Sequence, residues 1–309
     1  MDGRSIRQLA TDVGFGEGPV VTTAGEIVIT SIDQGRLYIV RVDGAVEVLA
    51  ELGGGPNGAT ADLNDDIFVA QNGGNWAVGR ERGLTPETFD PAGVQKVSLV
   101  DGSVEFVSNA PLAPNDLCFG PDGLLYVTDP TRERAFNEGR IWSVDPASGV
   151  ATMLYEVDWY TNGIGFALED DVMYVASTRA QQIVALPTDP STGSKGEVVV
   201  QMRRGQPDGF TFDAEGNIVI AAIGENPGDP GSVQTWSLKG EQLDEFNPGP
   251  SKHYTNVTLG ADRTLILTDS DAGLLLAIDD WPTAGLALHP VRQKDRLAPA
   301  LAPGLAKPN

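Results

Sequence analysis

Six short polar motifs recur along the chain, and each carries a side chain with oxygen atoms close to the start of an apolar stretch. The motifs read EGP, PNG, PND, TNG, PDG and TNV, and their recurring polar residues are Glu17, Asn57, Asn115, Asn162, Asp208 and Asn256. Carboxylate and amide oxygens are the donors that Ca²⁺, Mg²⁺ and Mn²⁺ prefer, and Zn²⁺ also accepts carboxylates. Glu17, Asn162 and Asp208 would supply two carboxylates and one amide carbonyl. Three protein ligands leave positions open for water and substrate, so such a cation would suit hydrolysis better than a structural role.

The spacing of these residues predicts a repeated fold. Successive positions lie 40 to 58 residues apart, and each is followed by an apolar strand, a tight turn and a second strand. A period of roughly 40–50 residues that holds four strands is typical of a β-propeller blade. We therefore predict an all-β, six-bladed β-propeller with four-stranded antiparallel blades around a central metal-binding channel. Residues 1–297 would form this single domain, and residues 298–309 would be a disordered tail, because Pro and Ala alternate there without an apolar period.

Individual strands are also visible in the sequence. Short runs such as RLYIV at 36–40 and VMYVA at 172–176 combine β-branched and aromatic residues between turn-forming residues. The stretches beginning at Arg36, Val94 and Arg140 each read as a hairpin. The longest interval follows Asn57, and we interpret residues 72–93 as an insertion between two strands of the second blade.

The propeller geometry gives the six motifs a common place. The innermost strand of every blade runs along the central channel, so a residue at its start faces the axis at one mouth. Six such residues would form a polar ring, and burying them without partners would cost a few kcal/mol each. The alternative is that Asn and Asp are turn-forming residues before a strand, and Asn57 and Asn256 are the candidates for that reading.

Charge and composition limit the partners. The chain has 309 residues and a formal net charge of −22, which repels phosphate backbones and anionic lipid heads but attracts cations. We therefore expect no nucleic-acid and no membrane partner. The single cysteine, Cys118, excludes an intramolecular disulfide and fits a reducing compartment. No signal-peptide-like or membrane-spanning run is present, so we expect a cytoplasmic protein. The oligomeric state is left open.

The motifs in their order resemble one known family. FGEGPVV, PNGATADLNDDIFVAQNGG, APNDLCFGPDGLLYVTDP, TNGIGFALEDDVMYVAS and QPDGFTFDAEGNIVIAA are similar to successive blade motifs of the SMP-30/gluconolactonase-like family, over residues 13–270. The resemblance implies a six-bladed propeller with one divalent metal ion in the channel and, in many members, lactone hydrolysis. It implies Glu17, Asn162 and Asp208 as metal ligands, Asp208 also as the candidate general base, and Asn115 as the residue that contacts the substrate.

The resulting expectation is a metal-dependent lactonase for a small-molecule lactone. Ca²⁺ is the favoured ion, with Zn²⁺, Mg²⁺ and Mn²⁺ as alternatives. Asn115, Asn57 and Asp129 are the candidate substrate contacts, and Trp76 is a further candidate for the pocket. The competing hypotheses are a propeller enzyme acting on another ester and a divalent-metal-binding propeller without catalysis. His253, three residues before Asn256, is within reach of the mouth, but we assign it no role, because a lone loop histidine is the commoner case.

Overall fold

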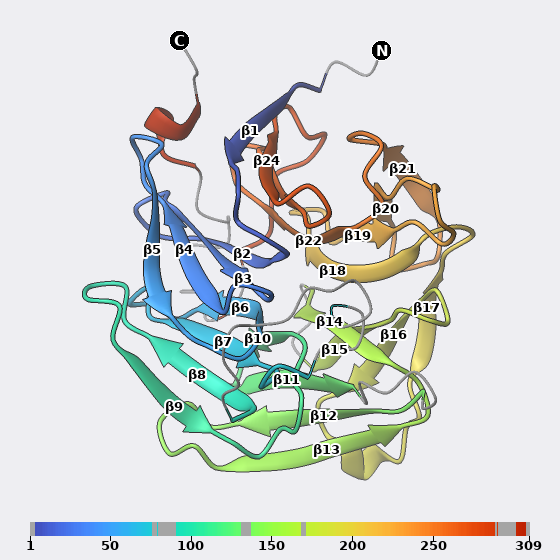
Figure 1. The fold of residues 1–309 in the computed structure, drawn as a ribbon. Coiled ribbons are helices and arrows are strands. Elements are labelled where there is room, and N and C mark those ends of the chain that lie inside the picture. Colours follow the sequence, from blue (N-terminus) through green and yellow to red (C-terminus); the bar gives the residue numbers. More distant parts are fainter. Residues whose placement is uncertain are drawn as a thin grey trace.

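Six four-stranded sheets surround a central axis in the computed structural model, which describes residues 4–75, 79, 91–130, 137–167, 171–287, 289 and 301–306 (Figure 1). Strands that are neighbours in a sheet pair antiparallel throughout. The predicted six-bladed, all-β propeller is therefore confirmed.

Five blades follow one another along the chain, each built from four consecutive strands, and the sixth takes one strand from the amino terminus. The first two blades contain β2 (Gly16–Val21), β3 (Ile27–Ser31), β4 (Arg36–Val40) and β5 (Val46–Glu51), then β6 (Pro56–Ala61), β7 (Ile67–Gln71), β8 (Gly93–Val97) and β9 (Val104–Ser108). The next two contain β10 (Leu117–Phe119), β11 (Leu125–Pro130), β12 (Gly139–Val144) and β13 (Ala151–Val157), then β14 (Thr161–Phe166), β15 (Val172–Ser177), β16 (Gln182–Pro187) and β17 (Glu197–Gln201). The last two contain β18 (Gln206–Phe212), β19 (Ile218–Ile223), β20 (Ser232–Trp236) and β21 (Gln242–Phe246), then β22 (Tyr254–Leu259), β23 (Leu265–Asp269), β24 (Leu274–Ile278) and β1 (Ile6–Ala10).

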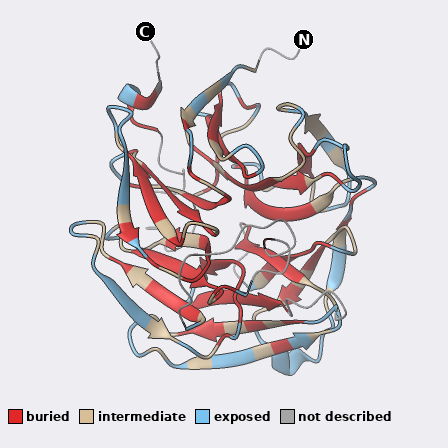
Figure 2. Ribbon diagram, viewed as in Figure 1, coloured by how far each residue is buried: buried red, intermediate tan, exposed pale blue. Residues whose placement is uncertain are grey.

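The apolar residues that predicted the strands are the ones that hold the blades together. Every residue of β3, β7 and β23 is buried, whereas most of the outermost strands β5 and β9 is exposed or half-buried (Figure 2). The core consists of apolar clusters between adjacent blades; one joins residues of β3 and β4 to residues of β7 and β8. Burying an Ile or Val side chain stabilises the fold by about 1.5–3 kcal/mol, so these seams hold neighbouring blades in place.

Predicted and observed elements agree closely at the strands. RLYIV coincides with β4, and VMYVA forms all but the last residue of β15. The three predicted hairpins are β4–β5, β8–β9 and β12–β13. The predicted insertion lies between β7 and β8, as expected, although Trp76 and most of that segment lie outside the described residues.

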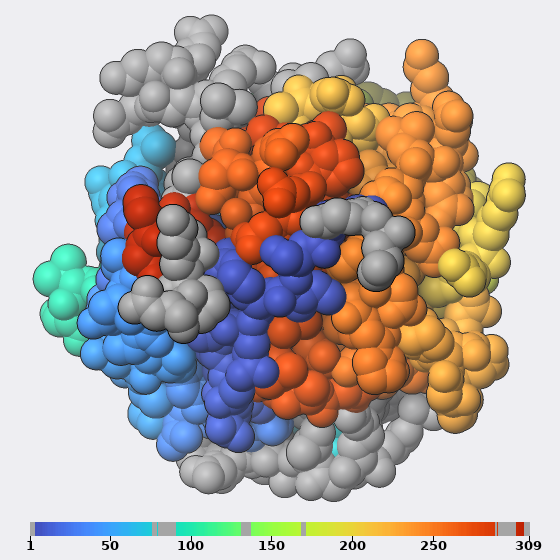
Figure 3. Space-filling view, turned by 90° about the horizontal axis from the view of Figure 1, so that it is seen from above, coloured from blue at the N-terminus to red at the C-terminus, as the bar shows by residue number. Residues whose placement is uncertain are grey.

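The amino-terminal strand closes the propeller, a feature that the sequence did not predict. β1 pairs with β24 and becomes the outermost strand of the sixth blade. Arg7 of β1 forms an ion pair with Asp279, with Nη2 2.6 Å from Oδ1, and donates from Nη1 to the carbonyl oxygen of Leu305 at 2.7 Å. Figure 3 shows the amino-terminal residues in blue, flanked by the first blade on one side and by the orange sixth blade on the other.

The described part of the carboxyl-terminal tail is packed against the propeller. Residues 301–306 end in the short 3₁₀ helix η2 (Pro303–Ala306), and Leu301 and Leu305 belong to an apolar cluster with Ala10 and Ile27. Two leucines among the alternating Ala and Pro thus contact the first blade, while the disordered tail over residues 298–309 stays a prediction. The other helix of the described residues is η1 (Pro190–Thr192), and no described helix is long and apolar enough to span a membrane.

Candidate functional site

The pairing of the inner strands is irregular at the polar motifs in five of the six blades. In β2, β6, β14, β18 and β22 the pairing register shifts across the motif, so that two residues drop out of the ladder. In the third blade the motif precedes the short strand β10 altogether. Threonines of the second strands hold the freed backbone: Thr30 Oγ1 donates to the carbonyl oxygens of Glu17 (3.0 Å) and Asn57 (2.6 Å).

Glycines that follow the ring residues let neighbouring blades approach at this level. A Cβ on Gly163 would lie 2.4 Å from the carbonyl oxygen of Asp208, and one on Gly209 would lie 2.3 Å from Cγ of Asn256. A Cβ on Gly18 would lie 2.4 Å from the backbone nitrogen of Ala59. Each motif therefore packs against the motif of the next blade. These contacts bring motifs of neighbouring blades together, and the polar ring stays a prediction.

Glu17 is a buried carboxyl in an unfavourable electrostatic environment. Glu17 is only 5% exposed, and this burial raises the pKa of its carboxyl well above the ordinary value. The charges of Asp208 and Asp116 raise this pKa further. Hydrogen bonds from Asn256 and Thr255 oppose this rise. Buried carboxyls that repel one another favour either protonation or a cation between them.

Asp116 is a further carboxyl whose charge acts on Glu17, in addition to Asp208. The sequence alone did not predict it as a site residue. It is buried, and burial raises the pKa of its carboxyl to about 7, although hydrogen bonds from the backbone of Leu117 and Ile164 oppose the rise. A Cβ added to Gly58 would lie 2.0 Å from Oδ1 of Asp116. Only glycine at position 58 therefore leaves room for the Asp116 carboxylate. One feature of the sequence could have indicated Asp116: it directly follows Asn115, at the position where four other motifs carry glycine.

Three asparagines present amide groups that are open to a ligand. Asn57 and Asn115 are 4% and 7% exposed, and their side-chain amides make no hydrogen bond with any described residue. Asn162 donates from Nδ2 to Thr178 Oγ1 at 3.0 Å, which leaves its carbonyl oxygen Oδ1 uncommitted in the described structure. Buried amides are normally hydrogen-bonded, so unsatisfied ones at a channel mouth indicate a bound species.

Two other residues of the predicted set have structural partners instead. Asn256 accepts a hydrogen bond at Oδ1 from the nitrogen of Val257 (2.8 Å), a local contact of the kind that a turn-forming residue makes. Asp129 is 0% exposed, and its two oxygens accept hydrogen bonds from Arg140, Trp142 and the backbone of residues 112 and 113. Asp129 therefore supports the segment before Asn115, and we do not retain it as a substrate contact.

The channel continues below the ring as a small cavity of about 40 Å³. Its lining includes Gly18, Asp116, Thr211 and Asn256. Thr211 is 2% exposed, and its hydroxyl has no hydrogen-bond partner in the described structure. Apolar residues such as Ile164, Phe210 and Phe212 also line it, and a cavity of this size holds a few water molecules and no larger group, so a substrate would have to bind at the mouth.

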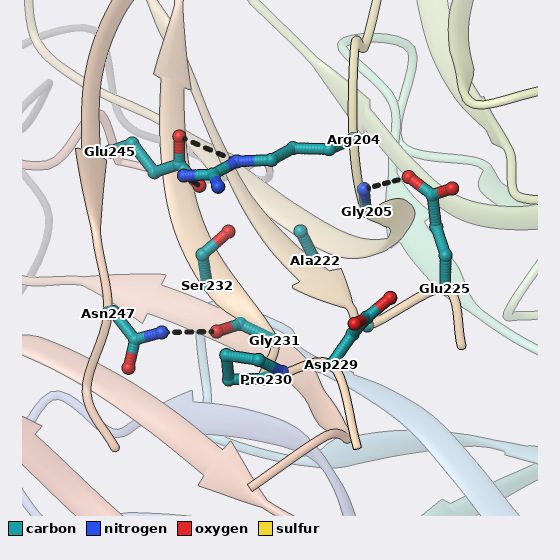
Figure 4. Close-up of a pocket in the computed structure, with 11 residues that line it drawn as sticks. Arg204, Gly205, Ala222, Glu225, Asp229, Pro230, Gly231, Ser232, Glu245 and Asn247 are labelled. Atoms are coloured by element: carbon teal, nitrogen blue, oxygen red, sulfur yellow. Dashed lines mark hydrogen bonds and ion pairs between the residues drawn. The ribbon is translucent and has the colours of Figure 1, made fainter. Parts of the chain in front are cut away.

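A second cavity, of about 240 Å³, lies at the same end of the fifth blade but outside the ring (Figure 4). Its walls carry an ion pair between Arg204 and Glu245, with Nη2 2.7 Å from Oε1, and a hydrogen bond from the nitrogen of Gly205 to Glu225 Oε1 at 2.7 Å. None of the six ring residues lines it. Its carboxylates are already engaged, since Asp229 accepts from Asn226 at 2.7 Å in addition to the pairs above, so we assign the cavity no chemistry of its own.

The donor set at the ring fits a hard divalent cation. Glu17 and Asp208 offer carboxylates, and Asn162 offers a free amide oxygen, the ligand types of Ca²⁺. A cation would also offset the repulsion that raises the pKa of Glu17. Among the described residues, no three side chains of His, Cys, Asp and Glu alone are grouped closely enough to hold a metal ion, so a site here requires the Asn162 oxygen.

Comparison with known proteins gives consistent matches. The family model described as SMP-30/Gluconolactonase/LRE-like region matches residues 15–271. A gluconolactonase of Zymomonas mobilis subsp. mobilis is 23% identical over 300 residues, which span 86% of this chain and 79% of that protein.

Solved structures share the fold. A gluconolactonase of Xanthomonas campestris superposes with a TM-score of 0.71 at 19% identity, covering 90% of both chains. Regucalcin, a calcium-binding protein of Agrobacterium tumefaciens, superposes with a TM-score of 0.70 at 21% identity, covering 89% of this chain and 93% of that one.

Proposed function

The chain belongs to the SMP-30/gluconolactonase/LRE-like family, and from its ring of polar residues we propose that it is a metal-dependent hydrolase that opens a lactone ring. The observation that carries this proposal is the mouth of the channel. Two buried carboxyls that repel each other, Glu17 and Asp208, lie at the same level as amides of Asn57 and Asn115 that have no described partner. Such a site would offer both a place for a cation and polar groups for a small oxygen-rich substrate.

Glu17, Asn162 and Asp208 would hold the cation, and Ca²⁺ is the ion we propose. When bound, it would supply positive charge that offsets the carboxylates and polarises a substrate carbonyl. Thr178 fixes the orientation of the Asn162 amide through its hydrogen bond at 3.0 Å. This contact would keep the ligand oxygen turned toward the axis before the ion arrives.

The remaining steps belong to the side chains at the mouth. Asn115 would donate from its amide nitrogen to the oxyanion that develops on the lactone carbonyl, since preorganised donors stabilise such charge without reorganisation. Asn57 would bind a further oxygen of the substrate. Asp208 would take a proton from the attacking water, because a carboxylate can act as ligand through one oxygen and as base through the other.

A second candidate is cation binding without catalysis. The structural likeness to a calcium-binding protein, regucalcin, is the observation that favours it. The two candidates share the ring and differ in the role of the unpartnered amides of Asn57 and Asn115. A panel of lactones therefore separates them directly.

The test is lactone opening measured by acid release, with sugar, aliphatic and aryl lactones as substrates. We expect at least one lactone to be opened, the rate to vanish after chelation, and Asp208→Ala to be inactive. Glu51→Gln changes an exposed carboxylate on the outermost strand β5 of the first blade, so it is the control and should keep full activity. Full activity of Asp208→Ala, or a rate that chelation leaves unchanged, would contradict the proposal; cation binding without any lactone opening would favour the second candidate.

A further inference from the structure

His253 and Asp271 form a dyad at the mouth of the channel. His253 Nδ1 lies 2.8 Å from Asp271 Oδ2, and the backbone nitrogen of His253 donates to the same oxygen at 3.1 Å. The ring of Phe15 lies beside the imidazole, with 6.0 Å between ring centroids. The two side chains are 19% and 24% exposed, so the pair is largely shielded but open to solvent on one side.

The second ring nitrogen of this histidine is uncommitted. Nε2 of His253 makes no hydrogen bond with any described residue, whereas Nδ1 faces Asp271. A carboxylate on Nδ1 holds an imidazole in one orientation. Nε2 is therefore the atom through which the dyad would exchange a proton.

The topology puts the dyad at the same end of the channel as the ring. His253 directly precedes β22, the inner strand of the sixth blade, which begins at Tyr254 and carries Asn256. Asp271 follows the end of β23, whose last residue Asp269 pairs with Tyr254. Phe15 directly precedes β2, the strand of Glu17. The dyad thus lies over the seam between the sixth and first blades, and both blades contribute to the ring.

From this geometry we propose that His253 is the general acid of lactone opening, and that Asp271 is its positioning residue; this rests on the proposed lactonase function. Water adds to the carbonyl carbon while Asp208 takes one of its protons. The bond between that carbon and the ring oxygen then breaks, and the protonated imidazole donates its Nε2 proton to the leaving oxygen, which becomes an alcohol. His253 regains a proton from solvent and Asp208 releases its own, so lactone and water give the hydroxy acid.

This role makes a prediction that depends on the leaving group. An aliphatic alkoxide leaves poorly without a proton, whereas a phenolate from an aryl lactone leaves without help. Loss of a general acid typically costs about 10²–10⁴-fold in rate. Loss of His253 should therefore slow the opening of aliphatic lactones much more than that of aryl lactones. If His253 had a purely structural role, its loss would lower the rates on both kinds of lactone equally.

The experiment compares kcat and KM on one aliphatic and one aryl lactone for wild type and three variants. His253→Asn keeps a donor near the position of Nδ1 and removes Nε2, Asp271→Asn removes the positioning charge, and His289→Gln is the matched control. His289 lies against Phe166, the last residue of an inner strand and so at the opposite end of the channel. Ca²⁺ binding by calorimetry reports whether each variant keeps the ring intact.

We expect His253→Asn to lose about 10²-fold in kcat on the aliphatic lactone, with little loss on the aryl lactone and unchanged Ca²⁺ affinity. Asp271→Asn should show the same pattern to a smaller extent, and His289→Gln should match wild type. Equal losses on both lactones, or no loss on either, would overturn the inference while leaving the lactonase function standing. A wild type that opens neither lactone would overturn both. If His253→Asn folds poorly, His253→Gln decides the question by the same comparison.

Discussion

At the scale of single residues, the site is a group of carboxyls that the fold buries together. The charges of Asp208 and Asp116 disfavour the charged form of Glu17, and the amides of Asn57 and Asn115 have no hydrogen-bond partner among the described residues. Each of these features costs folding free energy unless a ligand is bound. Binding of a cation and a substrate would therefore remove the charge repulsion and the unsatisfied hydrogen-bonding groups that destabilise the metal-free protein.

Glu17→Gln should separate metal affinity from stability. We expect Ca²⁺ affinity to fall by at least about 10–100-fold, because a charged ligand is lost. The metal-free variant should unfold at no lower urea concentration than wild type, because a buried carboxyl that its neighbours repel has been neutralised. Calorimetric titration and urea denaturation measure the two effects. Glu51→Gln makes the same change at an exposed residue that pairs with Arg36, and it should leave Ca²⁺ affinity unchanged.

Asp116 should make the stability of the metal-free protein depend on pH. Burial raises its pKa from 3.8 to about 7, so the folded state binds more protons than the unfolded state between these values. Stability should therefore fall as pH rises from about 4 to 7, by an amount on the order of a few kcal/mol. Asp116→Asn should remove this part of the pH dependence in chelated protein, as measured by urea denaturation at several pH values. An unchanged profile would contradict the assignment.

Residue identities at the site were only partly predictable. The repeating motifs were sufficient to predict the six blades, and they put Glu17, Asn115, Asn162 and Asp208 at equivalent positions of the repeat. The role of Asp116 was not visible, because it depends on the space left by a glycine in another blade. The hydrogen bonds of the Asp129 carboxylate could not be predicted either, because its donors lie on a neighbouring strand and in residues 112 and 113.

At the scale of elements, the inner strands position the site through their irregular starts. The register shift in each motif frees two residues from the ladder, and a glycine then lets the next blade approach. The strands themselves were predictable, because each blade repeats a local pattern of apolar runs and turn residues. The irregular starts were not, since they depend on contacts between blades.

Gly58→Ala tests this packing. The added Cβ would lie 2.0 Å from Asp116 Oδ1 and 2.7 Å from its Cα, so the Asp116 segment would have to move. We expect a loss of stability of about 1–3 kcal/mol and weaker Ca²⁺ binding, measured by urea denaturation and calorimetry. At Gly249 the nearest atom to an added Cβ is the hydroxyl of Tyr254 at 3.2 Å, so Gly249→Ala is the matched control. Equal effects of the two substitutions would refute the packing argument.

At the scale of the whole molecule, closure of the propeller joins the two ends of the chain. β1 completes the sixth blade, and Arg7 connects it to Asp279 and to the carbonyl oxygen of Leu305. The sequence did not reveal this closure, because β1 has a weakly apolar pattern and its partner strand lies some 270 residues further along the chain. Closure keeps the six blades in register around the channel and therefore supports the ring.

Asp279→Asn should weaken this closure in a pH-dependent way. The hydrogen bond from Arg7 holds the pKa of the Asp279 carboxyl below its ordinary value, so its contribution is present above the unfolded-state pKa. That contribution is lost as pH falls through the lower folded-state pKa. We therefore expect wild type to be more stable than the variant at pH 7 and the difference to disappear at strongly acidic pH, by urea denaturation. Asp280→Asn removes an exposed partner of Arg263 at 3.5 Å and should have little effect at any pH.

The most direct test of the proposed function is a calcium titration of the chelated protein, followed by the initial rate of lactone opening. If Glu17, Asn162 and Asp208 hold one essential cation, the rate should rise from near zero and level off once a single equivalent is bound, and Asp208→Asn should show no rise. A rate that is already full in the chelated protein, or that ignores the added calcium, would contradict the account.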